Sequence, residues 1–133
     1  MGDGAGTVVD GQTRLELVVP PDPNLLRIVR LVASGLASLA DLDLDGVEEV
    51  RVAADEIVST LIEASKGSSG EPVHVRLTVT DTALCLDAST ALGAGGSLHV
   101  DPMADRVLEA VASRFEWWTD GDGVAHARAE RDR

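Results

Sequence analysis

The side chains best placed to do chemistry lie on one predicted helix. Glu56 and Thr60 are four residues apart within the stretch 50–64, and a helix puts residues at that spacing side by side on one face. The pair therefore presents a carboxylate and a hydroxyl on the same face. Taken alone, this spacing is more typical of a charged, solvated helix face than of a reactive site.

Other polar groups carry weaker signals. The backbone N–H groups of the glycine-rich loop 93–96 are able to cradle a phosphate. The loop lacks both a following Lys-Ser and a Rossmann spacing, so a plain flexible loop is favoured. Three histidines (His74, His99 and His126) are far apart and have no metal-ligand spacing, so no metal site is predicted. The single cysteine, Cys85, lies between two leucines and is predicted to be a buried or half-buried thiol.

The composition excludes several classes of protein. The chain has 133 residues, 23 of them acidic and 11 basic, and its formal net charge is -12. Because neither half is basic, direct binding of DNA or RNA is not expected, and an acidic surface favours a basic protein partner. No apolar run is long enough for a transmembrane helix, and the first residues lack the basic and apolar regions of a signal peptide. These features predict a cytoplasmic protein without membrane contact.

Periodicity and capping residues predict the elements that position Glu56 and Thr60. Asp22-Pro23 and Asp101-Pro102 each combine a helix-capping carboxylate with a proline at the first helical position. A further helix is expected from Asp45 or Gly46 to residue 66, and alternating apolar residues predict strands at 13–19, 73–79, 83–87, 115–119 and 124–130. The order β-α-α-β-β-α-β-β predicts an α/β (α+β) two-layer sandwich with a mostly antiparallel sheet and helices on one face. Residues 1–12 are expected to form a flexible tail before a single domain over residues 13–130.

The stretch 54–64, Ala-Asp-Glu-Ile-Val-Ser-Thr-Leu-Ile-Glu-Ala, resembles a known motif. It is similar to the N-box of the anti-sigma-factor and serine-kinase family of the RsbW and SpoIIAB type, within the GHKL (Bergerat-fold) ATPase superfamily. The element order is similar over about residues 13–130, and "DLDLDGVEEVRVAADEIVSTLIEAS" looks like mycobacterial-type members. The resemblance implies Glu56 as general base, Thr60 at the position of a magnesium-coordinating asparagine, and Asp87 as the adenine-binding aspartate.

The sequence departs from this family wherever phosphate is handled. Thr60 is a shorter and weaker ligand than asparagine. The Asp-x-Gly-x-Gly box reads Asp-Ala-Ser-Thr-Ala over residues 87–91, and Pro-Met-Ala over 102–104 stands where the family has Gly-x-Gly. The lid between these boxes is short. An ATP and magnesium site is therefore predicted to be weak or lost, and the chain to be a pseudo-kinase. The alternative is an active serine kinase that phosphorylates its antagonist.

The resemblance also implies partners. It predicts an anti-sigma factor that sequesters a stress-response-type sigma factor from RNA polymerase and is released by an anti-sigma-factor antagonist. Arg27 matches a helix arginine that meets an acidic sigma residue in the family, and helical spacing places Asn24, Arg30 and Leu31 on the same flank. Leu26 and Leu31 lie off the main buried stripe of this helix, so we expect a homodimer that uses this exposed apolar surface.

Overall fold

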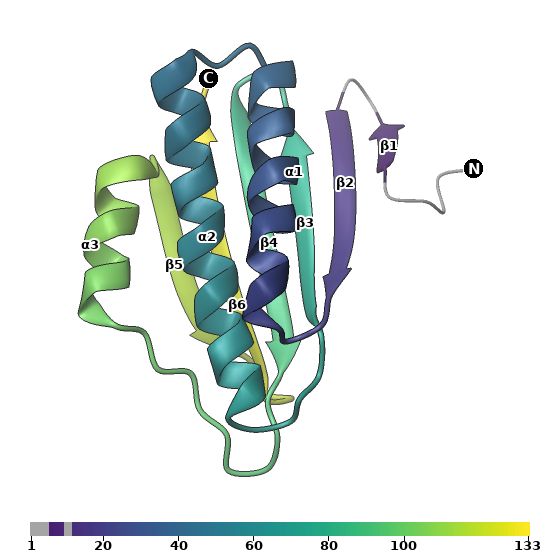
Figure 1. Ribbon diagram of the computed structural model, residues 1–133, viewed down its shortest axis with the longest axis vertical. Helices are drawn as coiled ribbons and strands as arrows, with labels where there is room; N and C mark the ends of the chain where they lie inside the picture. The colour runs from purple at the N-terminus through teal and green to yellow at the C-terminus, as the bar shows by residue number, and fades with distance from the viewer. Residues whose placement is uncertain (1–5, 10–11) are drawn as a thin grey trace.

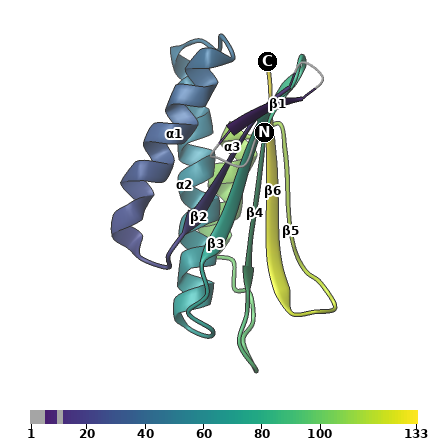
Figure 2. The ribbon, with the colours of Figure 1, turned by 90° about the vertical axis from the view of Figure 1, so that its right-hand side faces the viewer.

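The described part of the chain forms one antiparallel sheet with helices packed on one of its faces (Figures 1 and 2). The computed structural model describes residues 6–9 and 12–133. Its sheet has six strands in the order β1-β2-β3-β4-β6-β5. The elements in chain order are β1 (Gly6–Val9), β2 (Gln12–Val19), the 3₁₀ turn η1 (Pro23–Leu25), α1 (Leu26–Leu39), α2 (Leu44–Lys66), β3 (Val73–Val79), β4 (Ala83–Ala91), α3 (Pro102–Val111), β5 (Arg114–Thr119) and β6 (Val124–Asp132).

The mixed architecture agrees with the prediction from sequence, and two elements differ. Strand β1 lies within the stretch expected to be a tail, and it pairs antiparallel with the start of β2. Residues 1–5, 10 and 11 of that stretch lie outside the described residues. Strand β4 runs to Ala91 rather than ending at Asp87, because it pairs along its whole length with β6.

Carboxylate caps fix where the helices begin. Asp22 accepts a hydrogen bond from the backbone N–H of Asn24 at 2.9 Å, and Asp101 accepts one from Met103 at 2.8 Å. Both caps were predicted from their Asp-Pro pairs. Helix α2 is capped by Asp43, which accepts from the N–H of Gly46 at 2.8 Å, so this helix begins slightly earlier than expected.

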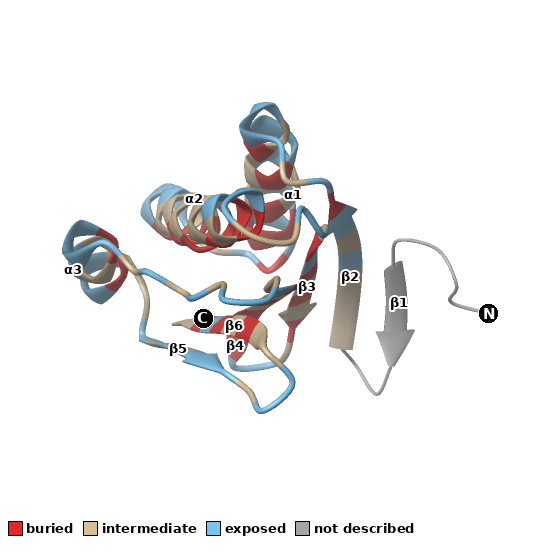
Figure 3. Ribbon diagram, turned by 90° about the horizontal axis from the view of Figure 1, so that it is seen from below, coloured by how far each residue is buried: buried red, intermediate tan, exposed pale blue. Residues whose placement is uncertain are grey.

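The core lies between the helices and the sheet and is almost entirely aliphatic (Figure 3). The predicted alternation of β3 is confirmed, since Val73, Val75, Leu77 and Val79 are all buried. The described residues contain no helix that is long and apolar enough to cross a membrane.

Helix α1 buries a different stripe from the expected one. Helical spacing predicts a buried apolar stripe of Leu25, Ile28, Val29, Val32, Leu36 and Leu39. Ile28 and Leu39 are nevertheless exposed, whereas Leu26 was expected at the surface and is buried at 9% exposure. Two alanines explain why a different face of α1 is turned toward the core. Ala33 and Ala37 are fully buried, and such small side chains let α1 pack closely against the core at positions that hydrophobic spacing underweights.

Candidate functional site

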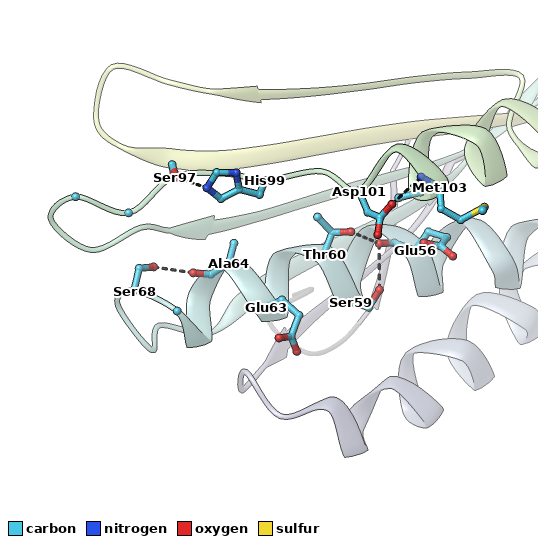
Figure 4. A pocket seen from close by; sticks show the side chains of 14 residues that line it. Glu56, Ser59, Thr60, Glu63, Ala64, Ser68, Ser97, His99, Asp101 and Met103 are labelled. Atoms are coloured by element: carbon cyan, nitrogen blue, oxygen red, sulfur yellow. Dashed lines mark hydrogen bonds between the residues drawn. The ribbon is translucent and has the colours of Figure 1, made fainter.

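A concave surface lies between α2 and the segment that leads into α3 (Figure 4). It is an open pocket of about 640 Å³. Glu56 and Thr60 both line it, together with Glu63 one turn further along α2. The helical spacing recognised in the sequence thus does bring the carboxylate and the hydroxyl to one cavity.

Asp87 does not join them. On β4, the core-facing residues Leu86 and Ala88 alternate with Asp87, which lies on the opposite face of the sheet. There it sits 3.7 Å from the guanidinium of Arg128 and lines a separate groove with Arg76. Asp87 therefore does not line the pocket that Glu56 and Thr60 share, and the structure does not bring the three predicted residues together.

Three of the four hydroxyl groups that line the pocket donate to backbone carbonyls of α2, and the fourth, on Ser97, is paired with His99 at 2.9 Å. Thr60 Oγ1 donates to the carbonyl of Glu56 at 2.8 Å, and Ser59 Oγ donates to the same carbonyl at 3.2 Å. Ser68 Oγ donates to the carbonyl of Ala64 at 2.7 Å. These oxygens have only lone pairs left for a ligand.

The start of α3 at the pocket is already occupied by a carboxylate. Helix N-termini bind phosphate through free N–H groups. Here Pro102 has no N–H, the N–H of Met103 is bonded to the Asp101 side chain, and that of Ala104 is bonded to the Asp101 carbonyl at 2.8 Å. Asp101 thus places a negative charge where a phosphate would have to bind.

The glycine-rich loop packs against the chain itself. A Cβ at Gly96 would lie 2.8 Å from Cβ of Ser68, and one at Gly93 would lie 3.1 Å from the backbone of Ser68 and Ser69. These glycines allow the loop to approach the turn that follows α2. This contact accounts for Gly93 and Gly96 without a bound phosphate.

The electrostatics of the pocket are acidic. Three lining residues, Glu56, Glu63 and Asp101, are carboxylates, and no lysine or arginine is among the described lining residues. Burial, and then the nearby charges of Asp55 and Asp101, raise the pKa of Glu56. The residues present therefore do not fit ATP with magnesium: the phosphate position is blocked by a carboxylate and the adenine aspartate lies on the far face of the sheet.

The residues predicted to meet a partner divide into two groups. Arg27 and Leu31 are exposed on α1, Asn24 is exposed on η1 just before it, and Leu31 is 68% exposed. Arg30 is instead part of the fold, because its Nε lies 2.7 Å from Oδ1 of Asp55 and ties α1 to α2. Ile28, at 48% exposure, adds apolar area beside Arg27.

Sequence reasoning missed the role of Asp101 in the pocket. The Asp-Pro pair identified it as a helix cap, but only the return of the chain from β4 places that cap in the same pocket as Glu56. Thr90 was also missed. It is fully buried on the core side of β4 and donates to the carbonyl of Pro72 at 3.0 Å.

Comparison with known proteins adds a likeness of fold. No family model and no curated protein sequence matches the chain. Among solved structures, a chain from "The crystal structure of SiaB-SiaC complex from Pseudomonas aeruginosa" superposes with a TM-score of 0.61. The match covers 90% of this chain and 89% of that chain, at 12% sequence identity. At this identity the likeness shows a shared fold alone, so the function has to be argued from the surface and the pocket.

Proposed function

We propose that this chain is a protein-binding regulator, and specifically an anti-sigma factor that keeps a stress-response-type sigma factor from RNA polymerase. The observation that carries the proposal is the outward face of α1. Arg27 forms no ion pair within the described part of the chain, and it is flanked by the exposed apolar residues Ile28 and Leu31. A charged anchor set in exposed apolar area is the usual composition of a protein interface.

The neighbouring strand extends this face. An apolar hollow of about 270 Å³ lies between β2 and α1, lined by residues that include Val18, Leu25 and Ile28. Val18 is 64% exposed. Exposed apolar patches on small soluble domains commonly mark binding sites. The solved structure that shares the fold is a complex of two proteins, which also supports a role in protein–protein recognition.

In this proposal, inhibition works by occlusion. Arg27 makes a two-pronged contact with a carboxylate of the sigma factor while the apolar residues of α1 cover sigma surface that RNA polymerase needs. An anti-sigma-factor antagonist releases the sigma factor by competing for the regulator. The free regulator is a homodimer that uses the same face of α1, so the sigma factor displaces one copy when it binds, and no bound nucleotide is needed.

The alternative function is an active serine kinase, with Glu56 as base, Thr60 on magnesium and Asp87 on adenine. It is the weaker reading for two reasons. Asp87 lies on the far face of the sheet, and Asp101 occupies the helix terminus that would receive phosphate.

The proposal is tested by reconstitution. The tagged chain is purified from its native cell, the co-purifying sigma factor is identified, and transcription by core polymerase with that sigma factor is measured. We expect inhibition by the wild-type chain and much weaker inhibition by Arg27→Ala. Arg106→Ala, which removes an exposed arginine from α3, is the matched control. Unimpaired transcription at saturating wild-type chain contradicts the proposal.

A further inference from the structure

The pocket between α2 and α3 offers acceptors to a ligand. Its charged groups are the carboxylates of Glu56, Glu63 and Asp101, none of which forms an ion pair within residues 12–133. Elsewhere in the described chain carboxylates do find cations, as in the pairs Arg30–Asp55 and Arg131–Glu49. The pocket thus holds three carboxylates without a counter-charge.

Three of the four hydroxyl groups in the pocket have the same polarity as its charges, and the fourth, on Ser97, is paired with His99. The hydroxyl protons of Ser59, Thr60 and Ser68 are bonded to helix carbonyls, so their oxygens can only accept from a ligand. The N–H of Met103 is likewise bonded to Asp101. A phosphate is itself an acceptor and is repelled here both by charge and by hydrogen-bond polarity.

From this disagreement with nucleotide we propose that the pocket binds a cationic side chain, an arginine or a lysine, on a segment of a protein partner. A guanidinium or ammonium group carries only donors and a positive charge, which complements the lining. At about 640 Å³ the pocket admits such a side chain together with the segment that bears it. Met103, exposed at the rim, gives the aliphatic stem of an arginine or lysine an apolar contact.

The geometry favours a fixed rather than an adaptable site. Asp101 is held by its hydrogen bond to Met103, and α3 is held against β5 by the indole N–H of Trp117, which donates to Asp105 at 3.0 Å. Glu56 lies on the long helix α2, whose neighbours Ile57 and Leu61 are in the core. The elements that carry Glu56 and Asp101 are therefore fixed before any ligand arrives.

The experiment is a nuclear magnetic resonance titration of the full chain with an acetylated, amidated tri-arginine peptide. We expect shifts in the amides of residues 95–103 and 56–64. The double variant Glu56→Gln with Asp101→Asn should raise the dissociation constant roughly tenfold, since each neutral isostere removes a charge-assisted contact. Asparagine also caps a helix, so Asp101→Asn preserves the start of α3.

Two controls separate this site from general attraction to an acidic protein. Glu109→Gln with Glu116→Gln changes the net charge equally but alters residues outside the pocket, and it should leave the dissociation constant unchanged. A tri-citrulline peptide, which keeps the shape and lacks the charge, should not shift the pocket amides. Equal weakening by both double variants, or binding of tri-citrulline, overturns the proposal.

The source of the cation, a protein partner, rests on the proposed function, whereas the preference for a cation does not. The two fail separately. A sigma factor complex that is lost with Arg27→Ala but unchanged in the Glu56→Gln, Asp101→Asn double variant keeps the anti-sigma proposal and overturns a partner side chain in the pocket. Specific binding of the peptide in the pocket, without any sigma factor complex, keeps the cation site and overturns the anti-sigma proposal.

Discussion

Two arginines one turn apart on α1 have different roles. Arg30 is bonded to Asp55 of α2, whereas Arg27 points outward beside Ile28. Helical spacing predicted that both would face a partner. Spacing alone cannot show which of the two arginines forms an ion pair with a carboxylate of the same chain. Only the packing of α1 against α2 brings Asp55 within 2.7 Å of Arg30.

Arg27→Ala should therefore reduce partner affinity with little change in stability. A central, desolvated contact would cost about 2 kcal/mol or more of binding energy, and the free energy of unfolding should change by less than about 0.5 kcal/mol. Arg30→Ala should instead lower stability, by at most about 1 kcal/mol because the pair is partly exposed. Titration against the co-purified sigma factor, beside a melting curve of each variant, measures both effects. An unchanged affinity removes Arg27 from the interface.

The pH dependence of stability should carry a signature of Glu56. Burial and the nearby aspartates raise the pKa of Glu56 in the folded chain, so ionisation destabilises the fold. This cost is absent below the unfolded pKa of about 4.3 and grows as pH rises through the raised folded pKa. Glu56→Gln should therefore raise the free energy of unfolding at pH 7 by no more than about 0.5 kcal/mol, and should leave it unchanged near pH 4. The variant then melts at a higher temperature than the wild type at pH 7 only. A variant that melts lower at pH 7 would show that the ionised Glu56 is stabilising.

At the scale of elements, local signals predicted much of the fold. Asp22 and Asp101 before proline marked two helix starts, and alternation marked β3. The end of β4 was not predictable in the same way, since pairing with β6 extends the strand to Ala91 through residues that carry no strong strand signal. The strand has a direct consequence for the site. Because side chains alternate along it, Asp87 faces away from the core residues Leu86 and Ala88, and so away from the pocket.

The glycines of two elements should respond in opposite ways to alanine. Gly96→Ala puts a Cβ 2.8 Å from Ser68 Cβ and 2.9 Å from the carbonyl of Gly93, so it should destabilise the chain by more than about 1 kcal/mol. Gly35→Ala lies in α1 with nothing within 4 Å, and should stabilise it by about 0.5–1 kcal/mol. Chemical denaturation of both variants is the measurement. A neutral Gly96→Ala would mean that the loop does not pack on the turn after α2.

For the molecule as a whole, the strongest expectation concerns nucleotide. The acidic pocket, the capped start of α3 and the position of Asp87 all oppose phosphate binding, so millimolar Mg-ATP should not change the melting temperature. A ligand at 100 times its dissociation constant would add about 2.7 kcal/mol, which is easily seen. Thr60→Asn, which introduces the asparagine of the motif that residues 54–64 resemble, should also give no shift, because the other obstacles remain. A magnesium-dependent shift in the melting temperature of the wild type would favour the alternative function, an active serine kinase.

The last expectation is assembly as a homodimer. Strand β1 pairs only with Gln12–Leu15 of β2, so among the described strands none pairs with Glu16–Val19 on that side. An open strand edge beside an apolar helix face favours pairing with another chain. Two copies related by a two-fold axis can join these edges antiparallel, and each then covers the exposed Ile28 and Leu31 of the other.

Ile28→Glu with Leu31→Glu should convert the dimer to a monomer, because a charge buried without a partner opposes association. Leu39→Glu is the control, since Leu39 is exposed at the far end of α1. Sedimentation at tens of micromolar should give about twice the chain mass of 13.9 kDa for the wild type and the control, and the single mass for the double variant. A wild type that sediments as one chain at this concentration would mean that no second copy covers the α1–β2 face, and the whole of it would then be available to a different protein partner.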